Sequence, residues 1–172
     1  MEWNKDIAGE VIGAWHEFMV SEYGYLVREN AREEAVCGAF YPFLRRLCEE
    51  WFVINVEYDK MNDELRQRAE KEIVIGESVH AVLPDIIIHR PRENDKQDNL
   101  LAIEMKKWAN GAWRHDVNKL REMTSPPQSG RHFQYRFGLL IRFRQTGDIG
   151  AALLFEEGTE CALNPKTLQR AE

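Results

Sequence analysis

The two stretches that decide the fold are PDIIIHR at residues 84–90 and NLLAIEMKK at residues 99–107. Both are rich in β-branched and aliphatic residues, and the polar segment PRENDKQD at 91–98 between them suits a hairpin loop. The sequence therefore predicts two antiparallel strands. Asp85 and Glu104 are equally far from the centre of this loop, so the predicted register places them directly opposite each other.

Asp85, Glu104 and Lys106 form a candidate metal-dependent site. Two carboxylates that face each other across a pair of strands repel, and burial strengthens the repulsion unless a cation or a shared proton lies between them. Mg²⁺ or Mn²⁺ fits two carboxylates completed by waters. Glu104 and Lys106 project from the same face of the strand, where Lys106 can orient or help deprotonate an attacking water and offset charge on a phosphate.

These residues also have a purely structural interpretation. Asp85 follows a proline and suits a turn cap. Glu104 and Lys106 suit the solvent face of an amphipathic strand. The run at 100–103 is apolar on both faces, however, which favours a central strand over that alternative.

Two helices are predicted before these strands. Residues 7–20 have apolar side chains at helical spacing, and residues 29–51 have a stronger apolar stripe. Asn30 is placed to cap the second helix, with Glu33 at the capping-box position. Pro42 should kink or break this helix.

The remaining elements complete an α/β pattern. Alternating residues predict a strand at 52–58, and further strands are predicted at 134–144 and 149–156. Helical spacing predicts a helix at 113–123, while the polar residues 60–72 suit a short helix or an exposed excursion. We therefore expect an α/β fold in which helices flank a mixed central sheet that has 149–156 at its edge.

The composition is that of an ordinary globular protein. Of the 172 residues, 44% are hydrophobic and 30% are charged. No apolar run approaches the ~18–20 residues of a membrane span, and the first ten residues are acidic, so a cytoplasmic protein without a membrane partner is expected. The cysteines Cys37, Cys48 and Cys161 lack zinc-ligand spacing and are expected to be reduced thiols.

Charge is distributed unevenly along the chain. The net charge is −6, but residues 1–80 carry −8 and residues 86–144 carry +6. The basic part suits contact with phosphates. Lys107, Arg114 and Lys119 are the candidates for nucleic-acid contact, although a solvated helix face explains them equally well.

The order PD, 18 intervening residues, then ExK resembles the PD-(D/E)xK nuclease superfamily, which has the restriction-endonuclease-like fold. The resemblance covers about residues 30–157. Within it, VEYDK at 56–60 and the later YRFGLLIRF match their places in uncharacterised bacterial members. Asp116 and Lys119 also match, as the Asp-x-x-Lys-Leu of the following helix.

The resemblance implies a set of metal ligands and a catalytic lysine, Lys106. The implied ligands are Asp85, Glu104, the backbone carbonyl of Met105 and a glutamate of the preceding helix. That glutamate is Glu33 or Glu34, and helical phase favours Glu33, because it continues the buried stripe towards the sheet. The capping-box role of Glu33 stays open as the alternative.

By this resemblance the expected function is metal-dependent hydrolysis of phosphodiester bonds in nucleic acid, with DNA preferred to RNA and Mg²⁺ or Mn²⁺ as cofactor. The alternative is a catalytically inactive module of the same fold that binds nucleic acid or a protein. One domain is expected over 1–172, with a helical extension at 1–28, a core at 29–157 and a tail at 158–172. A homodimer or a larger complex stays open.

Overall fold

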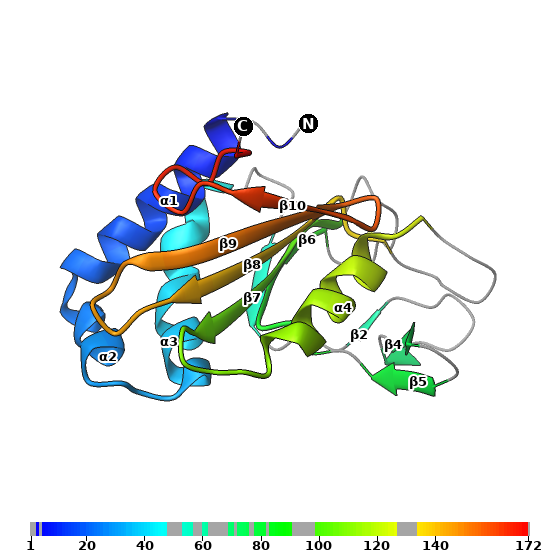
Figure 1. Cartoon of the computed structure of the whole chain (residues 1–172), viewed down its shortest axis with the longest axis horizontal. Coiled ribbons are helices and arrows are strands. Elements are labelled where there is room, and N and C mark those ends of the chain that lie inside the picture. The colour runs from blue at the N-terminus through cyan, green and yellow to red at the C-terminus, as the bar shows by residue number, and fades with distance from the viewer. Residues whose placement is uncertain are drawn as a thin grey trace.

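A computed structural model describes Trp3 and residues 5–47, 53–56, 60–61, 69–70, 72–75, 78–81, 83–90, 99–126 and 134–171. At its centre is a six-stranded sheet in the order β1-β6-β7-β8-β9-β10 (Figure 1). The strands are β1 (Val53–Val56), β6 (Ile86–His89), β7 (Asn99–Lys107), β8 (Phe137–Phe143), β9 (Ile149–Glu156) and β10 (Thr159–Leu163). β7 and β8 run parallel, and the other neighbours are antiparallel.

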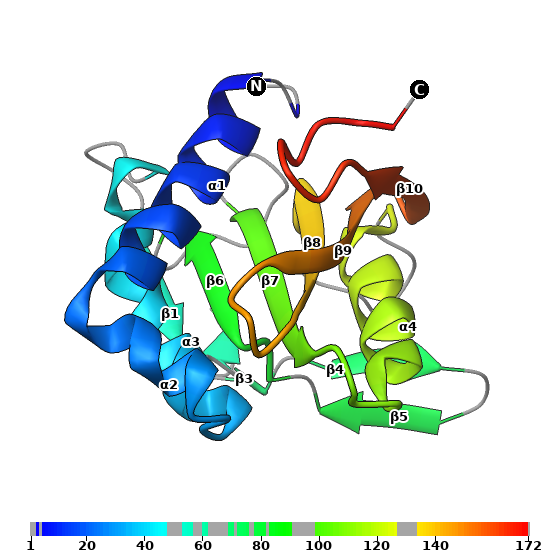
Figure 2. The same ribbon diagram turned by 60° about the vertical axis from the view of Figure 1, so that its left-hand side comes forward.

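Helices cover both faces of this sheet. One face carries α1 (Lys5–Val20), α2 (Tyr25–Arg28) and α3 (Glu33–Phe40), and the other carries α4 (Trp113–Thr124) (Figure 2). The 3₁₀ turn η1 (Glu22–Gly24) joins α1 to α2. The predicted α/β class, with helices flanking a mixed sheet, is confirmed. None of the described helices is long and apolar enough to cross a membrane.

Two apolar layers hold the helices on the sheet. The larger layer joins α1 and α3 to the sheet and includes Trp15, Phe18, Phe40, Ile88 and Ile103. The smaller layer lies under α4 and includes Ile87, Ala102, Leu120, Tyr135 and Phe155. Successive residues of a strand point to opposite faces, so β6 and β7 are buried on both sides, as their apolar sequences predict.

The register of β6 on β7 confirms the predicted hairpin. Ile86 pairs with Ile103, and Ile88 pairs with Leu101. The register shifts only beyond Ile88, near the loop. One step further in the other direction, Asp85 comes opposite Glu104.

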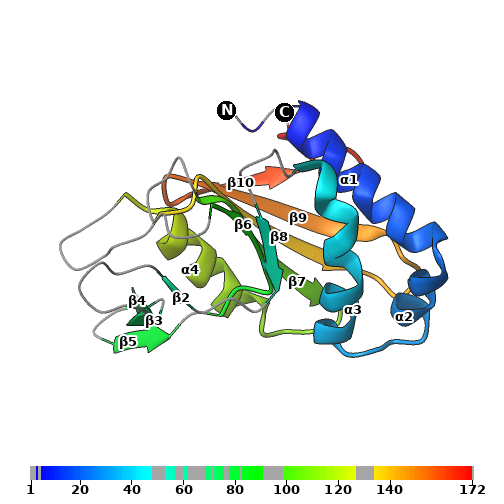
Figure 3. The ribbon, with the colours of Figure 1, turned by 180° about the vertical axis from the view of Figure 1, so that it is seen from behind.

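The helix predicted over 29–51 is divided. α3 ends at Phe40, and the chain continues as the 3₁₀ helix η2 (Tyr41–Leu47). Pro42 is the second residue of η2, so the break predicted at this proline is confirmed. From behind, α1 and α3 lie side by side across the sheet (Figure 3).

The capping prediction for Asn30 is wrong. Arg32 is the N-cap residue of α3, and its side chain makes no capping hydrogen bond. Asn30 instead has a φ of 56° and donates its N–H to the Val27 carbonyl at 3.1 Å, directly after α2. Asparagine tolerates this left-handed conformation, so the residue ends one helix rather than starting the next.

The excursion after β1 forms two short hairpins. β2 (Lys60–Met61) pairs with β3 (Ala69–Glu70), and β4 (Glu72–Ile75) pairs with β5 (Ser78–Ala81). The described part of 60–72 therefore contains strands, and the alternative of a short helix there is not supported. The β4–β5 hairpin lies at the α4 side of the molecule (Figure 3).

The edge strand on the C-terminal side is β10, so the edge position predicted for 149–156 is wrong. β10 pairs with β9 through a turn at Glu157 and Gly158, which have φ values of 52° and 75°. Positive φ at both central residues is the geometry of a tight two-residue hairpin turn. This turn keeps β10 against β9.

The two ends of the chain meet beside β10. The Trp3 indole donates a hydrogen bond to the Leu168 carbonyl at 3.0 Å. Leu163 of β10 forms an isolated β-bridge with Arg170. The last residues therefore fold back along the outer side of β10, and both termini lie on the same side of the molecule (Figure 1).

Candidate active site

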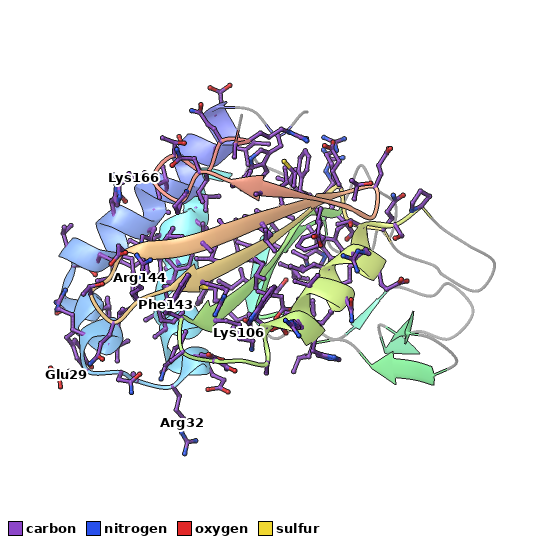
Figure 4. All side chains as sticks on the ribbon, in the orientation of Figure 1. Glu29, Arg32, Lys106, Phe143, Arg144 and Lys166 are labelled. Carbon is purple, nitrogen blue, oxygen red and sulfur yellow. The ribbon has the colours of Figure 1, made fainter. Side chains whose placement is uncertain are left out.

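The candidate site lies where β6 begins and β7 ends, on the face of the sheet that α4 covers. Glu104 and Lys106 project from β7 towards α4, because both contact charged side chains of that helix. Asp85 lies one residue before β6. Figure 4 shows Lys106 near the end of β7, on the side of α4. The structure thus brings together the three residues that the sequence predicts to act together.

Asp85 is held by the backbone of β7. Its Oδ2 accepts a hydrogen bond from the Met105 N–H at 2.7 Å. In an antiparallel pair, the N–H and C=O of one residue point to the same neighbouring strand. The Met105 carbonyl, the ligand implied by the resemblance, therefore faces the same edge of β7 as Asp85.

Glu104 is a fully buried carboxylate. Its Oε1 lies 2.6 Å from Lys119 Nζ, while its Oε2 has no hydrogen-bond partner within the described residues. Burial raises the pKa of Glu104 well above its usual range, and Asp85 raises it further, whereas Lys119 opposes the shift. A buried oxygen without a partner is costly, and a cation or an ordered water is the usual way to satisfy it.

Lys106 lies between carboxylates from two helices. Its Nζ is 3.3 Å from Glu33 Oε2 and 3.7 Å from Asp116 Oδ2. Burial lowers the pKa of Lys106, but Asp116, Asp85 and Glu33 outweigh burial, so the pKa lies above its ordinary value. Lys106 is therefore a cation at neutral pH, suited to stabilising negative charge rather than to accepting a proton.

Glu33, and not Glu34, reaches this cluster. Glu33 Oε1 accepts hydrogen bonds from the Lys107 N–H and from Asn110 Nδ2, each at 2.9 Å. Burial raises the pKa of Glu33, but these hydrogen bonds and Lys106 outweigh it, so the net pKa is lowered. Glu34 is exposed. Glu33 thus ties α3 to the end of β7, in the position that helical phase favoured.

Glu33→Gln is expected to destabilise the protein by about 1–2 kcal/mol at pH 7, because neutral hydrogen bonds replace charge-assisted ones. A lowered folded-state pKa means that the carboxylate stabilises the fold above its unfolded pKa of about 4.3. That contribution is lost as the pH falls through the folded-state pKa. Urea unfolding of wild type and variant should therefore differ at pH 7 and converge as the pH falls below the folded-state pKa of Glu33.

Glu34→Gln is the matched control for this measurement. Glu34 is the adjacent residue of the same helical turn and is exposed, so its replacement should change stability by less than about 0.5 kcal/mol. A loss of stability in the Glu33 variant that stays the same as the pH falls from 7 through the acid range would contradict a role for the charge.

Two residues of α4, Asp116 and Lys119, belong to the same cluster. They are three residues apart, so they share one face of the helix, and Lys119 Nζ lies 3.8 Å from Asp116 Oδ1. Lys119 also donates to the Leu83 carbonyl at 3.2 Å and is 8% exposed. The nucleic-acid contact predicted for Lys119 stays a prediction, and the structure places its ammonium inside the site.

The other two predicted nucleic-acid contacts lie outside the cluster. Lys107 Nζ donates to the Asn30 carbonyl at 3.0 Å, on the α3 side of the sheet. Arg114 is exposed, and its guanidinium carbon lies 5.9 Å from the centre of the Trp113 ring. These side chains are therefore placed to contact a bound molecule around the site rather than within it.

The charges of the cluster do not balance. The carboxylates are Glu33, Asp85, Glu104 and Asp116, and the ammonium groups are those of Lys106 and Lys119. Among the described residues, the four carboxylates and two ammonium groups of the cluster leave a formal charge of −2, which one divalent cation would neutralise. Burial raises the pKa of Asp85 and of Asp116, as expected for carboxylates short of positive partners.

No group of three or more His, Cys, Asp or Glu side chains among the described residues is arranged to hold a metal ion by itself. Mg²⁺ is commonly held by one or two carboxylates, with waters and substrate phosphates as its other ligands. Asp85, Glu104 and the Met105 carbonyl fit this kind of site. Glu104 Oε2, which has no partner in the described part of the chain, is the atom that a cation would satisfy.

Comparisons of the chain with protein-family models, with curated proteins and with solved structures found no match. The arrangement of the site is therefore the basis for assigning a function.

Proposed function

We propose that the protein is a metal-dependent nuclease with a restriction-endonuclease-like fold that hydrolyses phosphodiester bonds. The observation that carries the proposal is the buried Glu104 carboxylate, which lies opposite Asp85 and whose Oε2 has neither a hydrogen bond nor an ion pair within the described residues. Lys106 adds a cation on the same face of β7. DNA in the cytoplasm is the proposed substrate, in preference to RNA.

The surrounding elements support the proposed fold. A hairpin of β6 and β7 carries the Asp85 and Glu104–Lys106 segments, and the parallel strand β8 follows after one helix. The preceding helix α3 supplies Glu33 to the same site. This order of elements is the one that the sequence resemblance implies for the superfamily.

In the proposed mechanism, Asp85, Glu104 and the Met105 carbonyl would hold Mg²⁺ or Mn²⁺. A cation held there would supply Lewis-acid chemistry, because it would polarise the phosphate and lower the pKa of a water molecule. The oxygen of a water would bond to phosphorus in line with the P–O3′ bond, which would break; the water would give up one proton to solvent, and the departing O3′ oxygen would take up a proton from solvent. Lys106, held by Glu33 and Asp116, stabilises the charge that develops on the phosphate oxygens.

The ion pair between Lys119 and Glu104 favours a second candidate. At 2.6 Å, the Lys119 ammonium already neutralises part of the charge that a metal would neutralise. The protein would then be a catalytically inactive module of the same fold, which binds nucleic acid or a protein. A homodimer or a larger complex is compatible with either function.

The experiment is a cleavage screen on single-stranded and duplex DNA and RNA with Mg²⁺, with Mn²⁺ and with EDTA. Wild type is expected to cleave with either cation and not with EDTA. Lys106→Met should slow cleavage about 10²–10³-fold, the usual effect of removing one group that stabilises transition-state charge. Calorimetric titration should show that this variant still binds Mn²⁺.

Lys166→Met is the control, because Lys166 is exposed and lies in the C-terminal segment, away from Lys106 (Figure 4). It should cleave at the wild-type rate. A wild type that binds Mn²⁺ but cleaves no substrate, or a Lys106 variant that cleaves at full rate, would contradict the proposed mechanism.

A further inference from the structure

Arginine and tryptophan side chains alternate beside the carboxylate site. From α4 to the end of β8, the members of this Trp–Arg row are Arg114, Trp113, Arg142, Trp108 and Arg144. The Arg142 guanidinium carbon lies 4.6 Å from the centre of the Trp108 ring and 5.0 Å from that of Trp113. Arg144 lies 4.7 Å from the Trp108 ring. Each guanidinium is therefore within cation–π distance of an indole.

The middle member of the row, Arg142, lies next to the proposed catalytic lysine. Lys106 and Arg142 are register partners on the parallel strands β7 and β8. Register partners on neighbouring strands lie about 4.8 Å apart, and their side chains project from the same face. Figure 4 shows Lys106 and Arg144 at the same end of the sheet, where β7 and β8 finish. A strand of nucleic acid cleaved at Lys106 would therefore pass directly over the row.

Trp108 presents an exposed aromatic surface between Arg142 and Arg144. It is 42% exposed, although it is a large apolar side chain. A Cβ at Gly150 would lie 2.6 Å from the indole, so this glycine lets the ring lie directly on the backbone of β9. The backbone of β9 at Gly150 supports the Trp108 ring, and part of the side chain remains accessible to solvent.

A cavity of about 330 Å³ adjoins Trp108. Its walls include Lys107, Trp108, Arg144, Gln145 and Thr146, and no carboxylate is among its described lining residues. Cavities of this size hold small organic groups. In a chain with a net charge of −6, a cavity lined by an arginine, a lysine and an indole is complementary to a phosphate joined to an aromatic base.

We propose that the Trp–Arg row and this cavity bind a single-stranded segment of the nucleic-acid substrate. Arginine contacts the phosphates, and an unpaired base stacks on Trp108, which a base inside a duplex cannot do. The inference rests on the proposed function, because that function places the cleaved bond beside the Trp–Arg row. It adds that the protein selects unpaired strands.

The ion pair of Arg144 does not prevent this role. Arg144 pairs with Asp148, and both side chains are about half exposed. Exposed ion pairs contribute little to stability, so a phosphate can replace the Asp148 carboxylate at small cost. Arg142 is held differently, because it donates a hydrogen bond to the Trp108 carbonyl at 2.6 Å. Arg142 therefore positions the tryptophan, while Arg144 is the arginine available to a phosphate.

The test is fluorescence anisotropy of a labelled oligothymidine, with wild type and variants in EDTA, where binding is measured without cleavage. Wild type should bind the single strand more tightly than a duplex of the same length. Trp108→Ala should weaken single-strand binding about 5- to 100-fold, the range found for the loss of one stacked base. Trp108→Phe keeps an aromatic ring and should bind nearly as wild type does, which separates stacking from misfolding.

Salt dependence tests the arginine. Arg144→Gln should lower the slope of log affinity against log salt by about 0.7, the value for one phosphate contact on a single strand. Arg121→Gln is the matched control, because Arg121 is a partly exposed arginine that is also in an ion pair, with Glu160 at 2.6 Å, at the other end of α4. It should leave both the affinity and the slope unchanged.

Equal affinity of wild type and Trp108→Ala for the single strand, or tighter binding of the duplex, would overturn the inference. These outcomes differ from failure of the proposed function. Single-strand binding that depends on Trp108, without cleavage in Mg²⁺, would contradict the proposed nuclease activity and support the proposed binding of single strands by the Trp–Arg row. Cleavage in Mg²⁺, together with single-strand binding that does not depend on Trp108, would support the proposed nuclease activity and contradict the proposed role of the Trp–Arg row.

Discussion

Glu104→Gln is expected to abolish Mn²⁺ binding and to reduce cleavage about 10³-fold or more in a protein that still folds. Glutamine keeps the volume of the side chain and an oxygen that can accept from Lys119, but it removes the negative charge that a cation needs. A metal ion contributes several kcal/mol to the stabilisation of a transition state, and each 1.36 kcal/mol is a factor of ten in rate. Calorimetric titration of Mn²⁺ and the cleavage assay measure the two effects.

Glu160→Gln is the control for this variant. Glu160 is an exposed glutamate of β10 that pairs with Arg121, on a strand that is not part of the site. Its replacement should leave the binding heat and the cleavage rate unchanged. If the Glu104 variant binds Mn²⁺ as wild type does, the cation is held elsewhere and the proposed site is wrong.

Lys119→Met is expected to destabilise the protein in EDTA by about 3–5 kcal/mol, because it leaves the buried Glu104 carboxylate without its ammonium partner. In a chain of this length each kcal/mol corresponds to about 2–4 °C, so the midpoint of thermal unfolding should fall by roughly 6–20 °C. Thermal unfolding followed by circular dichroism measures this shift. Lys166→Met, at an exposed lysine, should change the midpoint by no more than about 1–2 °C.

A second replacement should restore the stability that Lys119→Met removes. In Lys119→Met with Glu104→Leu, apolar groups replace both charges, and such replacements of buried ion pairs are often neutral or stabilising. Saturating Mn²⁺ should also raise the midpoint of the single variant, because a cation at Asp85 and Glu104 supplies the missing positive charge. A single variant as stable as wild type would show that the Lys119–Glu104 ion pair does not form.

The central hairpin could be predicted from the sequence because its signals are local and strong. The apolar run at 100–103 and the polar loop before it predict both the strand and its register, and the pairing of Ile86 with Ile103 confirms that register. β10 could not be predicted in this way. Of its residues, only Leu163 is buried, and its turn uses Glu157 and Gly158 instead of the more typical Asn-Gly pair.

Part of the candidate site could be predicted from the sequence, and the reason is similar. Asp85, Glu104 and Lys106 lie on two adjacent strands, so the register alone places them together. Asp116 and Lys119 lie on a helix with many polar residues, and a polar face normally indicates solvent. Here their burial depends on charged partners on β7, which no pattern within one helix reveals. Glu33 was identified by helical phase, but its bond to the Lys107 N–H required the tertiary structure.

The return of the C-terminal residues along β10 affects how copies of this chain could assemble. An open edge strand is a template on which another chain can add a strand and extend the sheet. Here the β-bridge of Leu163 with Arg170 already occupies the end of that edge, and the Leu168 carbonyl accepts a hydrogen bond from the Trp3 indole. A second copy would have to displace this C-terminal segment before it could add a strand at the edge of β10. A dimer of this chain would therefore associate through side chains of another surface, rather than as one continuous sheet across β10.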